Sequence, residues 1–336
     1  MLSLKEIQTQ LNQATVIPNE IIQHIYKERW LQIWVPKQYK GLGLGFSEGL
    51  QLLKKLAATD GSLGWMVTLC AGANYFSRNL KPEIAQLLFK DDFTCFGGSG
   101  MIGGTAEKQG DNYLISGFWK YATGAPHLSH FTLNAVVTEN NISVLDGDGK
   151  EQIRSFIIPK NQVTFVADWK SMGMKATGTF SFTVDEVLVS EDYSFTYNTF
   201  YTESILDKIP FRIFADLTLL INYLGMAQHF CEQALLINSD LKIAFFNNEV
   251  EIMVGKTFEF AHKVETYLLE KNTDLDALQS EIHQFGVEKV AYLAHEILNF
   301  YMQLGIVASN ENQPINQIFK DFFTATQHAN FRRADS

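Results

Sequence analysis

The sequence predicts a mainly helical protein with a central β-barrel and a C-terminal four-helix bundle. In residues 1–92 and again in 201–336, apolar residues recur at the spacing of helices that bury one face. Between them, in residues 93–200, apolar and polar residues alternate as they do in half-buried strands. The three ranges are the predicted domains: an N-terminal helical domain, an antiparallel β-barrel domain and the bundle.

The first range contains short helices separated by breaks. Leu50, Leu53 and Leu56 repeat at helical spacing after the glycine-rich segment 41–45, which predicts a loop followed by a helix. Ser47 is the expected N-cap of that helix, because its hydroxyl can accept a hydrogen bond from an unpaired N–H at the helix start.

The middle range has the pattern of β-hairpins. Turn-forming pairs separate its alternating runs at residues 110–111, 140–141 and 146–147. No helical segment lies between these runs, which disfavours a parallel α/β sheet. We therefore expect an antiparallel sheet or small barrel.

The last range predicts four antiparallel helices. One contains Leu217, Leu220, Leu224 and Phe230, and the others cover residues 247–271, 275–305 and 314–329. Pro314 suits the first turn of its helix, where the N–H that proline lacks would have no partner in the helix.

Composition narrows the function classes. The net charge of -10, with a pI of about 5.3 and no run of Lys and Arg, argues against nucleic-acid binding. No apolar stretch approaches the roughly 20 residues of a membrane helix, and the start of the chain does not resemble a signal peptide. The three isolated cysteines fit a reducing cytoplasm and form no metal-binding spacing. We expect a cytoplasmic enzyme or binding protein without a metal site.

Two segments of the barrel region place aromatic residues a few positions before a Thr-Gly pair. Residues 117–124 read G-F-W-K-Y-A-T-G, and residues 169–178 read W-K-S-M-G-M-K-A-T-G. Nearer the N-terminus, 35–41 reads V-P-K-Q-Y-K-G, and 56–62 reads L-A-A-T-D-G-S before Trp65. With the order helices, strands and bundle, these motifs make nearly the whole chain resemble the acyl-CoA dehydrogenase superfamily.

This resemblance implies a flavin cofactor, FAD or FMN. The backbone of segment 95–100 would meet the pyrimidine edge of the ring, and the hydroxyl of Thr123 would lie near flavin N5. A flat, mostly apolar ring needs aromatic packing and a few hydrogen-bond donors at its edges. The predicted cofactor-binding residues are Gly97, Gly98, Ser99, Gly100, Tyr121, Thr123, Trp169, Thr177 and Gly305. The predicted substrate-pocket residues are Trp65, Trp119 and His127, with Trp119 also a candidate for packing around the ring.

Two chemistries are found in this superfamily. An acyl-CoA dehydrogenase needs a carboxylate to remove a proton next to the thioester. The two positions where the family usually has this base fall on Ala329 and near Ala215, and only Asp216 is close. One residue along a helix turns a side chain by roughly 100°, so Asp216 would be a poor substitute.

The C-terminal region instead resembles the two-component flavin-dependent monooxygenases. Residues 305–328 fit their pattern G-G-x-A-(x)5-P-(x)5-[RK]-D-(x)5-Q-H, which ends here on His328. The resemblance implies that His328 helps to form or hold a flavin hydroperoxide. Histidine suits this role because it can donate a hydrogen bond or a proton near neutral pH.

Two positions depart from the family pattern, and an arginine is missing. Ile306 replaces a second glycine and Lys320 replaces an arginine, and no arginine occurs between Arg212 and Arg332. These departures would weaken the grip on the ADP half of FAD. Reduced FMN, loosely bound FAD and no flavin at all therefore remain alternatives.

The sequence favours a flavin-dependent oxidoreductase, specifically a monooxygenase that uses reduced flavin and O2 on a small aromatic or heteroaromatic substrate. We expect a homodimer or homotetramer served by a separate flavin reductase. The predicted catalytic residues are His328 and Thr123. One alternative is an acyl-CoA dehydrogenase with FAD and a non-standard base, Asp216. The other is a catalytically degenerate member of the family.

Overall fold

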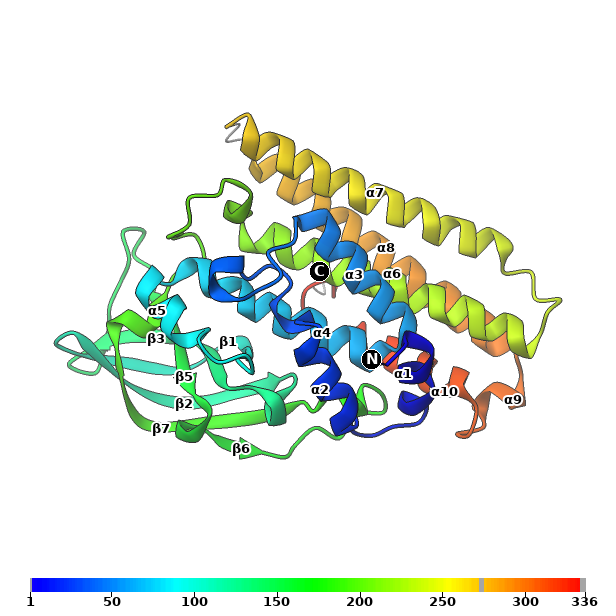
Figure 1. The fold of residues 1–336 in the computed structure, drawn as a ribbon, viewed down its shortest axis with the longest axis horizontal. Coiled ribbons are helices and arrows are strands. Elements are labelled where there is room, and N and C mark those ends of the chain that lie inside the picture. The colour runs from blue at the N-terminus through cyan, green and yellow to red at the C-terminus, as the bar shows by residue number, and fades with distance from the viewer. Residues whose placement is uncertain (1, 272–274, 333–336) are drawn as a thin grey trace.

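The computed structural model describes residues 2–271 and 275–332, in which helices come first, strands second and helices last (Figure 1). The N-terminal helices are α1 (Leu4–Leu11), α2 (Asn19–Lys27), α3 (Phe46–Thr59), α4 (Gly61–Asn74) and α5 (Pro82–Leu88). The strands are β1 (Phe96–Gln109), β2 (Asn112–Ala122), β3 (His130–Glu139), β4 (Ile142–Ser143), β5 (Ile153–Pro159), β6 (Thr164–Val166), β7 (Phe180–Ser190) and β8 (Ser194–Phe195). The C-terminal helices are α6 (Phe211–Ile237), α7 (Ala244–Leu269), α8 (Leu275–Gln303), α9 (Ile306–Ser309) and α10 (Pro314–Ala325).

The strands form a single sheet in the order β6-β7-β2-β1-β3-β5-β8, with β4 paired to β3. Among the described residues this sheet is not closed, so the predicted barrel is corrected to an open sheet whose edges are β6 and β8. Neighbouring strands are antiparallel except β1 and β3, which are parallel. The hairpin partner β2 returns the chain to the end where β1 begins, so β3 starts beside β1 and runs in the same direction.

A double bulge interrupts β1 near its start. Gly98 pairs with Thr132 and Ile102 pairs with Asn134, so three residues of β1 face one residue of β3. The ladder between β1 and β2 begins only at Gly104. Bulged residues lose their ladder partners, so the backbone of residues 99–101 is available for other contacts.

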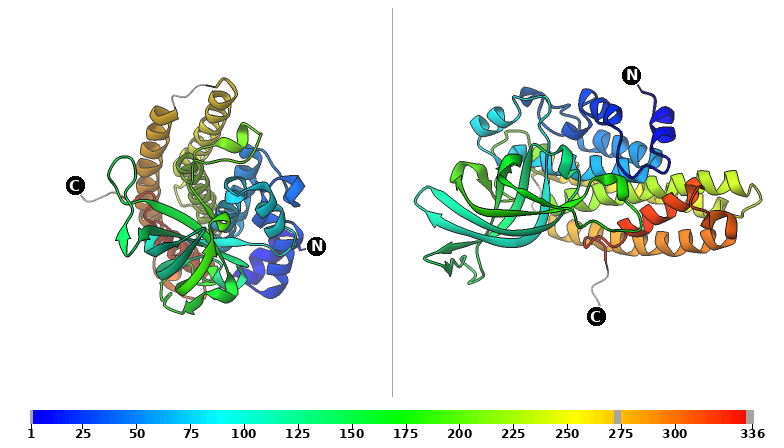
Figure 2. Two further views of the ribbon diagram at one scale, coloured as in Figure 1. Left: turned by 90° about the vertical axis from the view of Figure 1, so that its left-hand side faces the viewer. Right: turned by 90° about the horizontal axis from the view of Figure 1, so that it is seen from below.

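Helices α4 and α6 form the centre of the molecule. Nearly every side chain of α4 is buried, as expected for a helix that is apolar on all sides. Helix α6 packs against α3, α4, α7, α8 and α10. Gly225 allows α6 to approach α3 closely, because a Cβ there would lie 2.6 Å from the carbonyl oxygen of Lys54. The sheet lies at one end of the molecule, and α7 and α8 extend away from it (Figure 2).

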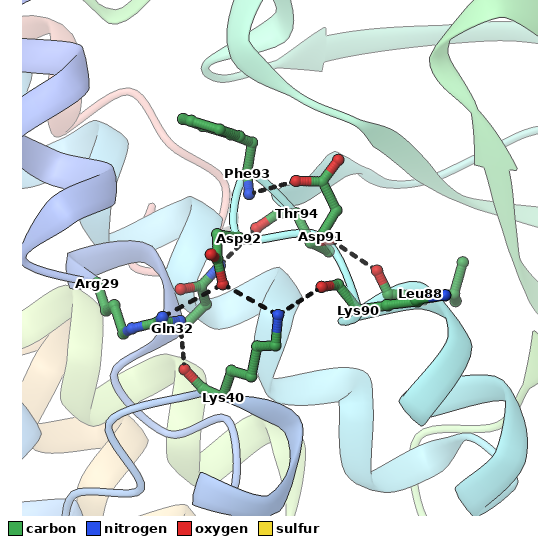
Figure 3. Close-up of polar contacts among 9 residues, drawn as sticks. All are labelled: Arg29, Gln32, Lys40, Leu88, Lys90, Asp91, Asp92, Phe93 and Thr94. Atoms are coloured by element: carbon green, nitrogen blue, oxygen red, sulfur yellow. Dashed lines mark hydrogen bonds and ion pairs between the residues drawn. The ribbon is translucent and has the colours of Figure 1, made fainter.

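Polar contacts connect the N-terminal helices to the segment that leads into β1 (Figure 3). Arg29 and Lys40 both form ion pairs with Asp92, and the side-chain amide of Gln32 donates to the carbonyl oxygen of Thr94. Lys40 has φ 62°, a left-handed conformation that usually favours glycine. The Lys40 side chain has a structural role at this position, because its contacts with Asp92 and the carbonyl of Lys90 help to fix the segment that leads into β1.

Two predicted helix ends are wrong. Gly45, and not Ser47, is the N-cap of α3, and the Glu48 carboxylate accepts from the Gly45 N–H. Helix α10 ends at Ala325, whereas the sequence predicted a helix to residue 329. His328 consequently lies in a turn after the helix.

None of the helices in the described ranges combines the length and apolar character needed to cross a membrane. In those same ranges no group of His, Cys, Asp and Glu could hold a metal ion. The three cysteines are buried and unbonded to one another.

Candidate functional site

A cavity of about 980 Å³ lies between the sheet, helices α4 and α6, and the turn after α10. Of the predicted site residues, it brings together Trp65, Gly97, Gly98, Ser99, Gly100, Tyr121, Thr123, Trp169 and His328. These residues come from segments more than 200 positions apart in the chain. The sequence motifs thus converge on one place.

The sheet contributes backbone to the cavity wall at the β1 bulge. Gly98 must be glycine, because a Cβ there would lie 1.8 Å from the carbonyl oxygen of Thr132. A Cβ on Gly100 would meet no atom within 4 Å, so this glycine leaves bare backbone beside open space. The carbonyl of Gly100 accepts from the side-chain amide of Asn134 at 2.9 Å. The bulge therefore presents peptide groups to a ligand without side chains in the way.

Three threonine hydroxyls form a chain that ends at the cavity. The Thr177 hydroxyl donates to the carbonyl of Met174 at 2.8 Å and lies 2.7 Å from the hydroxyl of Thr179. Since the Thr177 proton is already committed, the Thr179 hydroxyl donates to Thr177. The Thr123 hydroxyl, 3.3 Å from Thr179, therefore donates to Thr179 through this longer contact, and a ligand in the cavity would have to replace that contact to receive the Thr123 proton. Thr177 itself does not line the cavity, so its contribution is indirect.

Two pairs of aromatic side chains line the cavity. Tyr121 and Trp169 meet edge to face with ring centroids 5.1 Å apart, and the Trp169 indole N–H donates to the carbonyl of Met174 at 3.0 Å. Trp65, on α4, meets the imidazole of His328 in the same manner at 5.4 Å. Edge-to-face contacts of this kind fix ring orientations as well as burying area.

The His328 side chain is exposed and lines the cavity, and desolvation by surrounding protein atoms lowers the pKa of its imidazole. The backbone N–H of Asn330 donates to its Nδ1 at 3.3 Å. The lowered pKa favours the neutral form of the ring, which accepts a hydrogen bond from the protein on one nitrogen.

Besides Thr177, four predicted site residues lie outside the lining of the cavity. Trp119 is fully buried in the sheet, where its indole N–H donates to the carbonyl of Asn134 and its ring stacks on Phe182, so it does not line this cavity. Two residues apart, Trp119 and Tyr121 would share a face of a regular strand, but the register shift between Trp119 and Ala122 breaks the alternation and leaves Tyr121 at the cavity. The lining of the cavity also omits His127, Gly305 and Asp216.

Asp216 is buried beside the cavity. Its carboxylate accepts from the side-chain amide of Asn330 at 2.7 Å and lies 3.2 Å from Nδ1 of His283. Burial raises the pKa of Asp216, and the bonds from Asn330 and His283 oppose that rise. Its two oxygens are thus engaged by protein groups.

Several cavity residues were not foreseen. An aromatic wall consists of Phe76, Phe195, Tyr197, Phe211 and Phe214. Lys120 and Arg332 supply positive charge, and no Asp or Glu of the described residues lines the cavity. No local spacing could reveal this wall, because its members lie on three separate segments that meet only in the folded protein.

The lining fits a flavin. Bare peptide groups and the Thr123 hydroxyl can hydrogen-bond a ring edge, while Trp169 and Tyr121 offer apolar surface. Lys120 and Arg332 can balance the charge of a phosphate, and no described carboxylate would repel it. The volume exceeds what a flavin ring alone requires, which leaves room for a second molecule.

The chain is similar in sequence and in fold to known proteins. Residues 3–85 match the family model "Acyl-CoA dehydrogenase, N-terminal domain". The chain is 25% identical over 161 residues to indole-3-acetate monooxygenase of Pseudomonas putida, a match that covers 48% of this chain and 40% of that protein. The chain thus matches less than half the length of this curated relative.

Solved structures match over a greater length. The crystal structure of the HsaA monooxygenase from M. tuberculosis has a TM-score of 0.88 at 18% identity, covering 98% of this chain and 92% of that chain. The complex of TdsC from Paenibacillus sp. A11-2 with FMN and indole has a TM-score of 0.78 at 18% identity, covering 97% and 91%. At this identity the likeness establishes the fold. The resemblance inferred from the sequence is therefore confirmed: the chain has the acyl-CoA dehydrogenase fold, and its relatives are flavin-dependent monooxygenases.

Proposed function

We propose that this protein is the oxygenase component of a flavin-dependent monooxygenase that acts on a small aromatic or heteroaromatic substrate. The observation that carries the proposal is the chemistry of the cavity lining. Among the described residues it contains an imidazole, hydroxyls, peptide groups and two cations, but no carboxylate. Abstraction of a proton next to a thioester requires a base of the kind that this lining lacks.

In this proposal the chain's own residues hold and shield the flavin. Peptide groups of the β1 bulge face the pyrimidine edge, Thr123 donates near N5, and Trp169 packs against the ring. When bound, reduced flavin supplies the electrons with which O2 is activated. His328, whose lowered pKa favours the neutral ring, offers a hydrogen bond at the reactive edge, and the apolar walls exclude water.

The aromatic wall is the proposed substrate subsite. Phe76 and Tyr197 stack at 5.2 Å with an interplanar angle of 5°, and Phe211 lies 4.7 Å from Phe76. Flat aromatic molecules pack well against such surfaces. One relative is an indole-3-acetate monooxygenase, and TdsC was solved in a complex with FMN and indole, which supports a substrate of this class for the present chain.

The alternatives have less support. As a dehydrogenase base, Asp216 would have to reach the substrate, yet it lies outside the lining and its oxygens are engaged by Asn330 and His283. A degenerate relative would be expected to fill the cavity with its own side chains, and this cavity is open. FMN and FAD both remain candidates, and a separate reductase would supply the reduced flavin. A homodimer or homotetramer stays a prediction.

Stopped-flow spectroscopy tests the proposal. The protein with reduced FMN or reduced FAD is mixed with O2 and followed by absorbance. We expect a transient species that differs from both reduced and oxidised flavin and that persists longer than in buffer alone. Oxidation that is identical with and without protein would contradict the proposal. Bleaching of oxidised flavin by an acyl-CoA without oxygen would favour the dehydrogenase.

A further inference from the structure

His328 owes its position to the turn that follows α10, since the helix ends three residues earlier. A turn that follows a helix keeps a fixed position only where contacts with the rest of the protein hold it. The contacts of residues 328–331 therefore decide where the imidazole lies.

Asn330 makes two contacts that connect His328 to the interior. Its backbone N–H donates to His328 Nδ1, and its side-chain amide donates to Asp216 of α6 at 2.7 Å. Asp216 in turn lies 3.2 Å from Nδ1 of His283 on α8. Asp216 is fully buried, so this attachment point is rigid.

Phe331 forms the second attachment. The Phe331 side chain is 5% exposed, and its ring centroid lies 6.1 Å from that of Tyr223. The ring also packs directly against Gly286, where a Cβ would come within 2.2 Å of it, so this packing requires glycine. The turn is thus pinned on both sides of the Asn330 peptide.

These contacts select one form of the histidine. A neutral imidazole carries its proton on one nitrogen, and the nitrogen that accepts a hydrogen bond must be the bare one. Because Nδ1 accepts from Asn330, the proton sits on Nε2. The ring then offers an N–H donor, and not a base, from its far side.

We propose that Asp216 and Asn330 are positioning residues that hold His328 in the Nε2–H form, so that it acts as a hydrogen-bond donor in the cavity. Asp216, which the sequence suggested as a possible base, would instead hold the side chain of Asn330. The catalytic meaning of this arrangement rests on the proposed monooxygenase function. The arrangement itself can be measured in protein without flavin.

The test uses nitrogen NMR of protein labelled with ¹⁵N-histidine, with His328→Gln to assign the signals. In the wild type we expect a bare Nδ1 and a protonated Nε2 for His328. Asn330→Ala should move both signals toward the average of the two tautomers. Asn316→Ala is the matched control, since Asn316 on α10 has a buried amide that bonds Tyr301 and Ala308 instead. It should leave the His328 signals unchanged.

Two substitutions at Asp216 separate an anchor from a base. The amide oxygen in Asp216→Asn can still accept from Asn330, so the His328 signals and the product formed per flavin oxidised should survive. Asp216→Leu cannot accept, and it should reproduce the effect of Asn330→Ala. We expect both disruptive variants to lose roughly tenfold in product per flavin oxidised, a loss typical of a misplaced group.

The outcomes are distinguishable. An Nδ1–H form in the wild type, or unchanged His328 signals in Asn330→Ala, would overturn the positioning role. Loss of all turnover in Asp216→Asn with unchanged His328 signals would do the same and would favour a base. If the signals behave as expected while the wild type shows no reaction of reduced flavin with substrate, the proposed function fails and the anchoring stands.

Discussion

The imidazole of His328 meets the indole of Trp65 edge to face, with ring centroids 5.4 Å apart and an interplanar angle of 74°. Trp65 is itself buried, and its ring centroid lies 5.9 Å from that of Tyr223 on α6. The turn after α10 therefore packs against helix α4 where both line the cavity. This contact joins the proposed hydrogen-bond donor to the most buried helix of the N-terminal region.

Replacing Trp65 should lower the product formed per flavin oxidised, and the loss should be larger when less of the contact with His328 remains. Trp65→Phe keeps an aromatic surface near His328 and should retain most product formed per flavin oxidised. Trp65→Leu leaves a void and should lower both that ratio and the free energy of unfolding, the latter by roughly 2–4 kcal/mol. Product analysis and urea unfolding check the two effects. Equal product ratios in both variants would show that Trp65 does not orient His328.

Removing the Thr123 hydroxyl should weaken flavin binding. Thr123→Val has nearly the same shape but offers no donor, so we expect roughly 5- to 10-fold weaker binding of FMN, the equivalent of one hydrogen bond. Thr123→Ser restores a donor and serves as the control. Fluorescence titration with FMN measures the affinities. Unchanged affinity in the valine variant would remove the Thr123 hydroxyl from the flavin site.

Lys120 and Arg332 should recognise the phosphate of the flavin. Lys120→Gln and Arg332→Gln are expected to weaken binding of FMN by several-fold, with the effect reduced at high salt because both side chains are exposed. Riboflavin, which has the same ring and no phosphate, provides the matched control ligand and should bind each variant as it binds the wild type. Equal losses for both ligands would place these cations away from the phosphate.

The buried carboxyl groups of Asp60 and Asp321 should make stability depend on pH. Burial and repulsion from Asp321 raise the pKa of Asp60 to about 7, and burial raises the pKa of Asp321 to about 6. The folded state then holds protons that the unfolded chain releases at a pKa of about 3.9, so stability falls as pH rises from about 4 to 7.

Asp60→Asn tests this dependence, because an asparagine can still cap α4 through the Leu63 N–H. The variant should gain stability relative to the wild type as pH rises from about 4 to 7, by roughly 2–4 kcal/mol across the range. Urea unfolding at several pH values measures this difference. A constant difference between the two proteins would mean that Asp60 does not titrate in that range.

The predictions from sequence were accurate where local patterns or family motifs carry the information. The order of helices and strands, the superfamily and the convergence of Thr123, Trp169 and His328 all followed from such patterns. The direction of β3 relative to β1 was wrong, because hairpin signals do not reveal on which edge a later strand adds.

Side-chain direction was the other weak point. Trp119 and Tyr121 belong to the same motif and would share a face of a regular strand, but a register shift after Trp119 leaves one buried in the sheet and the other exposed to the cavity. The role of Asn330 depends on a contact with Asp216, 114 residues away, that no local spacing encodes.

A crystal structure of the complex with FMN tests the central claim most directly. The account predicts the flavin ring in the cavity between the sheet and α6, with Thr123 within hydrogen-bond distance of N5, Trp169 against the ring and Nε2 of His328 directed toward its reactive edge. A flavin bound elsewhere, or a ring in the cavity with His328 turned away from it, would contradict the account.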